Sequence, residues 1–210
     1  MKAKQMRRLA LGARAVPLLL ALIGAVMAGD AGWAYLWETA WVNLRPLPVY
    51  QPGPRAAGQG AEDVPLWMPS PRLGQKIGEL VFPAEGVRVP VVQGDSWADL
   101  ALGAGHDPAS ALPGQGSNVY VAGHRDTVFH VLSRLRVGDL VEFETAYGTF
   151  TYQVTGAQIV PPTDTAVTAP TPRETLTLQT CWPFDYIGFA PLRYIVHTRF
   201  LHGPRSTNRD

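Results

Sequence analysis

Cysteine is nearly absent from this chain of 210 residues, in which Cys181 is the only one. An intramolecular disulfide is therefore excluded, and Cys181 is either a small buried apolar residue or a reactive thiol. An excess of charge is also absent, because 18 Lys and Arg nearly balance 17 Asp and Glu. The formal net charge of +1 gives no electrostatic reason to expect nucleic acid as a partner. Acidic residues are sparse and scattered, so the sequence predicts neither a metal site nor a cofactor.

Proline and glycine are abundant, with 19 and 21 residues. This composition favours short strands joined by turns over a helical bundle. Apolar residues make up 46% and charged residues 17%, which is a globular balance. The length suits one domain with additional segments, and no internal repeat is evident. We therefore predict an all-β domain.

The N-terminal segment begins with five basic residues up to Arg14 and has no acidic residue before Asp30. Residues 15–29, AVPLLLALIGAVMAG, are uncharged, and apolar character resumes in AGWAYLW after Asp30. A membrane-spanning helix needs about 20 apolar residues, so residues 15–37 suffice if Asp30 lies near the outer interface. The aromatic residues beyond it are typical of an interfacial belt; they are Trp33, Tyr35, Trp37 and Trp41.

Residues 1–41 are therefore predicted to be a cytoplasmic basic flank and a single-pass membrane anchor in contact with lipid. The alternative is a cleaved signal peptide, since Val26-Met27-Ala28 approximates a small-x-small cleavage pattern. Both interpretations place the rest of the chain on the extracytoplasmic, or periplasmic, side of the inner (cytoplasmic) membrane.

The remainder divides into three segments. Residues 42–75 are rich in proline and glycine and are predicted to be a semi-rigid spacer, although Trp67 and Met68 indicate that part of it packs on the next domain. Residues 76–203 are the predicted catalytic domain, and 204–210 a disordered tail. Strand-like runs recur in this domain between turn signals, at 77–82, 87–92, 118–123, 139–145, 148–160, 175–181 and 193–200. Such spacing indicates a sandwich or a closed barrel, with short helical turns over 96–103 and 127–135.

The run TLTLQTC places Cys181 at the end of a predicted strand. Its alternation puts Leu176, Leu178 and Thr180 on one face and Cys181 on the other, less apolar one. The pattern therefore favours an accessible thiol over one buried for packing. A thiol is a weak nucleophile near neutral pH unless a base or a cation stands beside it.

Two residues at other strand ends are candidate partners for this thiol. His124 comes directly after the run NVYVAG, and Arg193 begins the run RYIVHTRF about where Cys181 ends its own. The segment WPFDYIGFAP can turn the chain so that these last two strands pair. A histidine that only caps a turn and an arginine in a surface ion pair are the plainer alternatives.

These motifs with their surroundings resemble a sortase, a cysteine transpeptidase of bacterial cell surfaces. The similar stretches, in family order, are IGELVFPAEGVRVPVVQG, LALGAGHDPASALPGQGSNVYVAGHRD, GHRDTVFHVLSRLRVGDLV, TLTLQTCWPF and APLRYIV. TLTLQTC is similar to the family's TLxTC signature. The GHRDT motif and the Cys-Trp-Pro-Phe continuation resemble class D or the sortases of Gram-negative bacteria more than the pilin-polymerising class C.

The resemblance implies a closed eight-stranded sortase β-barrel with Cys181 as nucleophile, His124 as general acid and base, and Arg193 stabilising the substrate or the oxyanion. It also implies cleavage of an exported protein's LPxTG-like C-terminal sorting signal between Thr and Gly. A thioacyl enzyme then forms, and an amine acceptor on the cell envelope or peptidoglycan resolves it. An N-terminal anchor with a spacer after it fits the same family.

Five further residues are candidate substrate-binding positions. Thr180 could contribute to the oxyanion site, and Trp182 and Phe184 to the peptide pocket. Asp126 either orients a neighbour or stabilises a turn, and His106 either lines the groove or is structural. Two other functions stay open: a peptidoglycan L,D-transpeptidase-like cysteine enzyme, and an inactive membrane-anchored binding module.

Overall fold

The structure is a computed structural model that describes residues 46–53, 66–185 and 188–204, together with Gly24, Val26 and Gly29. These three early residues are helical, and the rest of the predicted anchor over 1–41 lies outside the described residues. In the part of the chain that is described, no helix has both the length and the apolar character needed to cross a membrane. The predicted tail likewise lies outside the described residues after Pro204.

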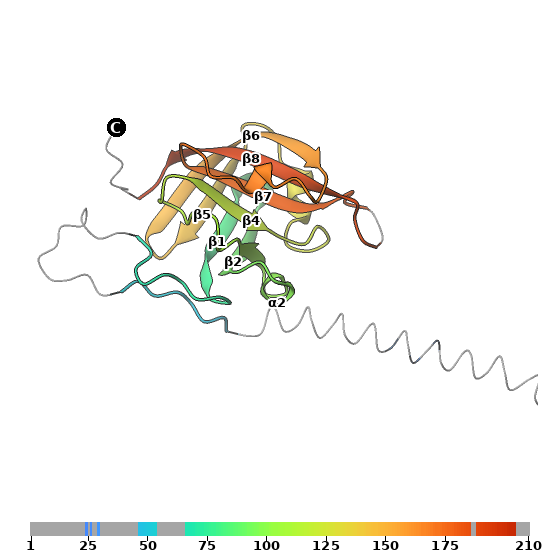
Figure 1. Cartoon of the computed structure of the whole chain (residues 1–210), viewed down its shortest axis with the longest axis horizontal. Coiled ribbons are helices and arrows are strands. Elements are labelled where there is room, and N and C mark those ends of the chain that lie inside the picture. Colours follow the sequence, from blue (N-terminus) through green and yellow to red (C-terminus); the bar gives the residue numbers. More distant parts are fainter. Residues whose placement is uncertain are drawn as a thin grey trace, which may run out of the picture. The chain divides into compact units, whose positions relative to one another are not determined.

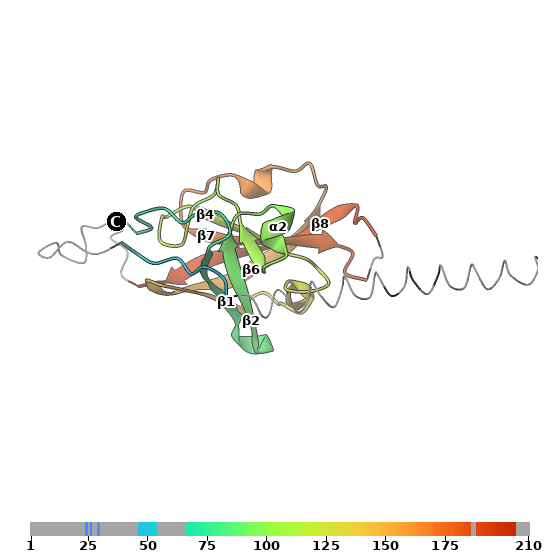
Figure 2. The same ribbon diagram turned by 90° about the horizontal axis from the view of Figure 1, so that it is seen from below.

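The elements in chain order are β1 (Lys76–Phe82), η1 (Pro83–Glu85), β2 (Val87–Gln93), α2 (Trp97–Leu100), β3 (Ala104–His106), β4 (Asn118–Ala122), η2 (His130–Ser133), β5 (Leu140–Thr145), β6 (Gly148–Val160), η3 (Ala166–Thr168), β7 (Thr175–Trp182) and β8 (Leu192–His202). The eight strands form a closed barrel in the order β1-β2-β3-β4-β7-β8-β6-β5. The pairs β2/β3 and β4/β7 are parallel, and the others are antiparallel. Figure 1 shows β7 between β4 and β8, and Figure 2 shows the β1–β2 hairpin ending in the short helix η1.

All seven strand-like runs of the sequence form strands, and the closed eight-stranded barrel is confirmed. The eighth strand, β3, is the one that periodicity missed. It has only three residues, Ala104–His106, and a glycine in its centre, so it carries no alternation that could be detected. The two predicted helical turns are present as α2 and η2.

The barrel interior is filled by the apolar face of each strand. On β7, Leu176 and Leu178 are fully buried, and on β6 Phe150 and Tyr152 are as well. The alternation that predicted strands thus also selects which side chains enter the core. Thr177 departs from the pattern, because it is 3% exposed although it points to the opposite, outer face of β7.

Parts of the predicted spacer pack on the barrel, as the apolar residue Trp67 indicated. Trp67 is 2% exposed, and its indole Nε1 donates to the carbonyl of Pro113 at 2.8 Å. The ring of Tyr50 lies 5.1 Å from that of Trp67, and the two phenol oxygens of Tyr50 and Tyr147 are 2.9 Å apart. Consequently the compact unit runs from Pro46 to Asp210 instead of beginning with the first strand.

Candidate active site

Cys181 is the second-last residue of β7 and carries a free, half-buried thiol. Its partner across the β7–β8 ladder is Arg193, the second residue of β8. Directly opposed residues of paired strands project from the same face of a sheet, so the thiol and the guanidinium leave the barrel on the same side. The expected pairing of these two strands, with Arg193 beside Cys181, is therefore confirmed.

Arg193 is held by the backbone at the start of its strand. Its Nη1 donates to the carbonyls of Leu192 at 3.0 Å and Ala190 at 3.3 Å. The side chain is half-buried. These bonds fix a permanently charged, planar donor group next to the thiol, where it can donate hydrogen bonds to an oxyanion.

Two hydrogen bonds bring the chain before His124 against the chain before Cys181. The backbone N–H of Gly123 donates to the carbonyl of Gln179 at 3.0 Å. The hydroxyl of Thr180 in turn donates to the carbonyl of Gly123 at 2.8 Å. The strands β4 and β7 run parallel, and Ala122, the last residue of β4, pairs with Gln179. His124 and Cys181 each come two residues after this pair, so they leave neighbouring strands at the same level.

Thr180, a candidate for substrate contact from the sequence, has another position in the structure. It is 2% exposed, and its hydroxyl is bonded to Gly123 inside the barrel wall. Alternation places this side chain on the face opposite Cys181. Thr180 therefore acts on the site by joining its two strands, not through substrate contact.

Trp97, which no sequence pattern singled out, lies against the imidazole of His124. Their ring centroids are 5.6 Å apart with an interplanar angle of 39°. Trp97 is the first residue of α2 and is 78% exposed. The signal that could have identified it is the SWADL motif. In this motif Ser96 caps a short helix, and Trp97, its first residue, is not on the buried face of that helix.

Trp182 and Phe184 come after the thiol in the chain but have different surroundings. Trp182 is half-buried at the end of β7, where it pairs with Leu192. The ring of Phe184 lies 5.3 Å from that of Tyr194 and 6.2 Å from that of His130, and it packs against the main core. Phe184 thus covers the end of the barrel, and no contact places it beside Cys181 among the described residues.

His106 and Asp126 are not brought together with the thiol. His106 has no exposed surface; its Nε2 lies 2.8 Å from the carbonyl of Ala111, and its Nδ1 lies 3.0 Å from Oε1 of Gln93. Of the two alternatives for His106, the structure therefore favours the structural one over a place in the substrate groove, because both ring nitrogens are used inside the protein. Burial lowers the pKa of His106 and keeps it neutral at pH 7. Asp126 is exposed in the loop after His124.

The outer face of β4, β7 and β8 is covered by the loop between β6 and β7. Val167 of η3 forms a small buried cluster there with Tyr120, Val160 and Ile195. The amide Nδ2 of Asn118 donates to the carbonyls of Val167 and Ala169, both at 3.1 Å. This cover explains why Thr177 is buried on the outer face, whereas Cys181, further along the same strand, is half-buried.

Tyr120 links this cover electrostatically to the site. Burial, and next the charge of Asp107, raises the pKa of the Tyr120 phenol, and the positive charge of Arg193 opposes this rise. The phenol is thus kept neutral, as a hydrogen-bonding group on the same outer face as Arg193.

Arg125 contacts the loop between β7 and β8. Its Nη2 donates to the carbonyl of Gly188 at 2.9 Å. Because Arg125 is the residue directly after His124, one side chain joins the histidine loop to the loop after the nucleophile.

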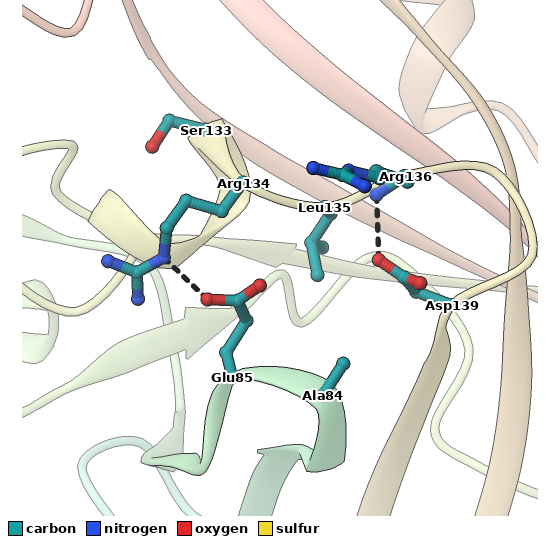
Figure 3. Close-up of a pocket in the computed structure, with 7 residues that line it drawn as sticks. All are labelled: Ala84, Glu85, Ser133, Arg134, Leu135, Arg136 and Asp139. Atoms are coloured by element: carbon teal, nitrogen blue, oxygen red, sulfur yellow. Dashed lines mark hydrogen bonds and ion pairs between the residues drawn. The ribbon is translucent and has the colours of Figure 1, made fainter.

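A pocket of about 650 Å³ lies elsewhere, between η1 and the segment joining η2 to β5 (Figure 3). The guanidinium Nε of Arg134 donates to Glu85 at 2.6 Å across it, and Leu135 lies between this pair and Asp139. Its lining residues are Ala84, Glu85, Ser133, Arg134, Leu135, Arg136 and Asp139. None of Cys181, His124 and Arg193 is among them, so this pocket is separate from the thiol.

Comparison with known proteins identifies the family of this chain. The model of the Sortase domain family matches residues 80–200. The chain is 32% identical over 191 residues to Sortase D of Bacillus subtilis (strain 168), a match that covers 88% of this chain and 96% of that protein.

Solved structures give the same result. A Sortase D5 transpeptidase from Clostridium perfringens matches with a TM-score of 0.59 and 26% identity, covering 64% of this chain and 84% of that one. The SrtA sortase from Actinomyces oris matches with a TM-score of 0.57 and 30% identity, covering 66% of this chain and 91% of that one. With the family model, the curated relative and the barrel in agreement, the chain belongs to the sortase family of cysteine transpeptidases.

Proposed function

We propose that the protein is a membrane-anchored sortase that cleaves an LPxTG-like C-terminal sorting signal between Thr and Gly and transfers the exported protein to an amine acceptor. The observation that carries the proposal is the register of the three strand ends. Cys181 stands opposite Arg193, and the Gly123–Gln179 and Thr180–Gly123 bonds hold the chain just before His124 against the other side of β7. A nucleophile is thus flanked by an acid–base group and by a fixed cation.

Acylation follows from this order of groups. The Cys181 thiolate attacks the carbonyl carbon of the scissile peptide bond, and the developing oxyanion is stabilised by the Arg193 guanidinium. The C–N bond breaks as the His124 imidazolium gives its proton to the departing glycine nitrogen. The products are a thioester on Cys181 and a neutral imidazole.

Transfer to the acceptor reverses the roles. The nitrogen of the incoming amine attacks the thioester carbon, and His124 takes the proton that this nitrogen loses. The C–S bond breaks, the new amide leaves, and the thiolate and imidazolium are restored. The coupled pair therefore passes one proton out and one back in each cycle.

The predicted location supports this reaction. A basic flank and an uncharged stretch over 15–29 favour an inner-membrane anchor, with the barrel on the extracytoplasmic side where exported proteins and envelope amines meet. A membrane extraction experiment tests this part: the intact chain should stay with the membrane at alkaline pH, and its release would contradict the anchor.

The function is tested with the full chain and a fluorescence-quenched LPxTG peptide, with and without hydroxylamine. We expect cleavage that hydroxylamine accelerates, because this amine captures the thioester, and that Cys181→Ala abolishes, because that variant cannot form the thioester. A protein that cleaves a peptidoglycan stem peptide, and no sorting-type peptide, would instead be the L,D-transpeptidase-like enzyme. A Cys181 that is inert towards both peptides would contradict the proposal and favour the binding module.

A further inference from the structure

The exposed ring of Trp97 is the feature beside the site that the proposed reaction leaves unused. A tryptophan that is 78% exposed leaves a large apolar surface in water, and here that surface borders a reacting group. Its ring centroid lies 5.6 Å from that of His124.

The backbone that carries Trp97 is fixed. Ser96 caps α2, with its hydroxyl and its N–H both donating to the carboxylate of Asp99, at 2.6 and 3.1 Å. Gly105 on β3 allows close packing beneath the helix, because a Cβ there would lie 2.4 Å from the backbone oxygen of Gly94 and 3.0 Å from Cδ2 of Leu100. The position of Trp97 beside His124 is therefore built into the fold and does not depend on a substrate.

The strand order places Trp97 at one end of a row. The start of β3 lies opposite the end of β4, as Gly105 pairs with Ala122, and β4, β7 and β8 are successive neighbours in the barrel. Across these ends the order is Trp97, His124, Cys181, Arg193. Trp97 is thus separated from the nucleophile by the histidine and lies furthest from the arginine.

This order places the reacting carbonyl oxygen and the reacting nitrogen on opposite sides of the thiol. In the proposed reaction the carbonyl oxygen of the thioester faces Arg193, and the nitrogen that leaves or enters faces His124. The remainder of the amine-bearing molecule must then extend past His124, where Trp97 stands.

The face of a tryptophan attracts an ammonium group, so the exposed ring of Trp97 suits an acceptor that carries a cationic amine.

We propose that Trp97 is a specificity-determining residue for the amine acceptor, its ring forming the surface along which a primary ammonium on a flexible chain reaches the thioester. This inference rests on the proposed sortase reaction. It concerns acceptor capture only, so the acylation step does not depend on Trp97.

Steady-state kinetics of the full chain test the proposal with the LPxTG peptide and two acceptors, triglycine and hydroxylamine. For Trp97→Ala we expect the KM for triglycine to rise about two- to fivefold, the size of an exposed cation–π contact. Trp97→Phe should retain most of the affinity, and Trp97→Leu should resemble the alanine variant, because leucine keeps the apolar bulk but lacks the π face. Hydroxylamine is largely uncharged near neutral pH and has no chain to lie along the ring, so its kinetics should not change.

The control is Val137→Ala, another exposed apolar side chain at 71% exposure, which should leave both acceptors unaffected. An unchanged KM for triglycine in Trp97→Ala would overturn the proposal. A loss of kcat/KM for the sorting peptide as large as the loss for triglycine would also overturn it, since Trp97 would then act by positioning His124. Both results can be told apart from failure of the proposed sortase reaction. In that case the unaltered protein itself would show no cleavage stimulated by hydroxylamine.

Discussion

At the scale of single residues, the site depends on polar side chains whose hydrogen bonds are made within the barrel wall. Asn118 is 3% exposed; its Nδ2 donates to Val167 and Ala169, and its Oδ1 accepts from the hydroxyls of Thr177 at 2.8 Å and Thr175 at 3.2 Å. One amide therefore joins β4, β7 and the loop that covers them. Asparagine is needed for this because it offers two donors and an acceptor on one short side chain.

Asn118→Asp is expected to destabilise the fold by about 3 kcal/mol. The aspartate side chain has nearly the same shape as asparagine. Its second oxygen replaces the Nδ2 amide group, so an acceptor instead of a donor faces the carbonyl oxygens of Val167 and Ala169. Urea unfolding at pH 7 measures the effect. The matched control is Gln153→Glu, the same amide-to-acid change at a half-buried position of β6, which should shift the midpoint much less. A midpoint for Asn118→Asp equal to that of the unaltered protein would show that the amide does not hold the loop.

At the scale of elements, the decisive contact is the junction of β4 and β7. The two strands are parallel and remote in sequence, yet their ends must stay aligned for His124 to serve Cys181. The buried hydroxyl of Thr180 makes this alignment by bonding to the residue just before His124.

Thr180→Val should lower kcat by about tenfold or more, with a smaller change in KM, because a displaced acid–base group slows chemistry more than binding. Valine has nearly the same shape as threonine, so the lost hydrogen bond is the main change; it should also reduce the free energy of unfolding by about 1–2 kcal/mol. Thr180→Ser restores the hydroxyl and should retain most activity. If the serine variant were as impaired as the valine variant, the methyl group and not the hydrogen bond would be responsible.

At the scale of the whole molecule, the barrel is completed by residues that precede its first strand. The backbone N–H of Tyr50 donates to Lys76 at 2.9 Å, and that of Lys76 donates to Pro48 at 2.8 Å. The N–H of Trp67 donates to the phenol oxygen of Tyr147 at 2.8 Å. These contacts and the burial of both rings make part of the predicted spacer a structural component of the domain.

A chain that begins at Lys76 should therefore be less stable than one that begins at Pro46. We expect a difference of about 3–5 kcal/mol, the usual cost of losing one large buried aromatic side chain. Chemical unfolding of both chains measures it, and Trp67→Ala in the longer chain should reproduce much of the loss. Equal unfolding midpoints would mean that residues 46–75 contribute nothing to the barrel.

Local pattern predicted much of this molecule. The alternation of Leu176 and Leu178 with polar residues predicted β7 and placed Cys181 on the outer face, and similar patterns predicted six other strands. The pattern did not reveal β3, whose three residues are too few for a period. It also did not show that Thr177 is buried, because the loop that covers it is distant in sequence.

The sequence by itself determined seven of the eight strands, the outer position of the single thiol and, through its motifs, the family. The tertiary structure confirmed that Arg193 lies opposite Cys181, and it alone decided that Thr180 bonds to Gly123, that His106 is enclosed in the core and that Trp97 lies against His124. The physical reason is that periodicity records which side of a strand faces the core, a local property. Strand order, ladder register and loop packing are set by contacts between segments far apart in the chain, and no local pattern encodes them.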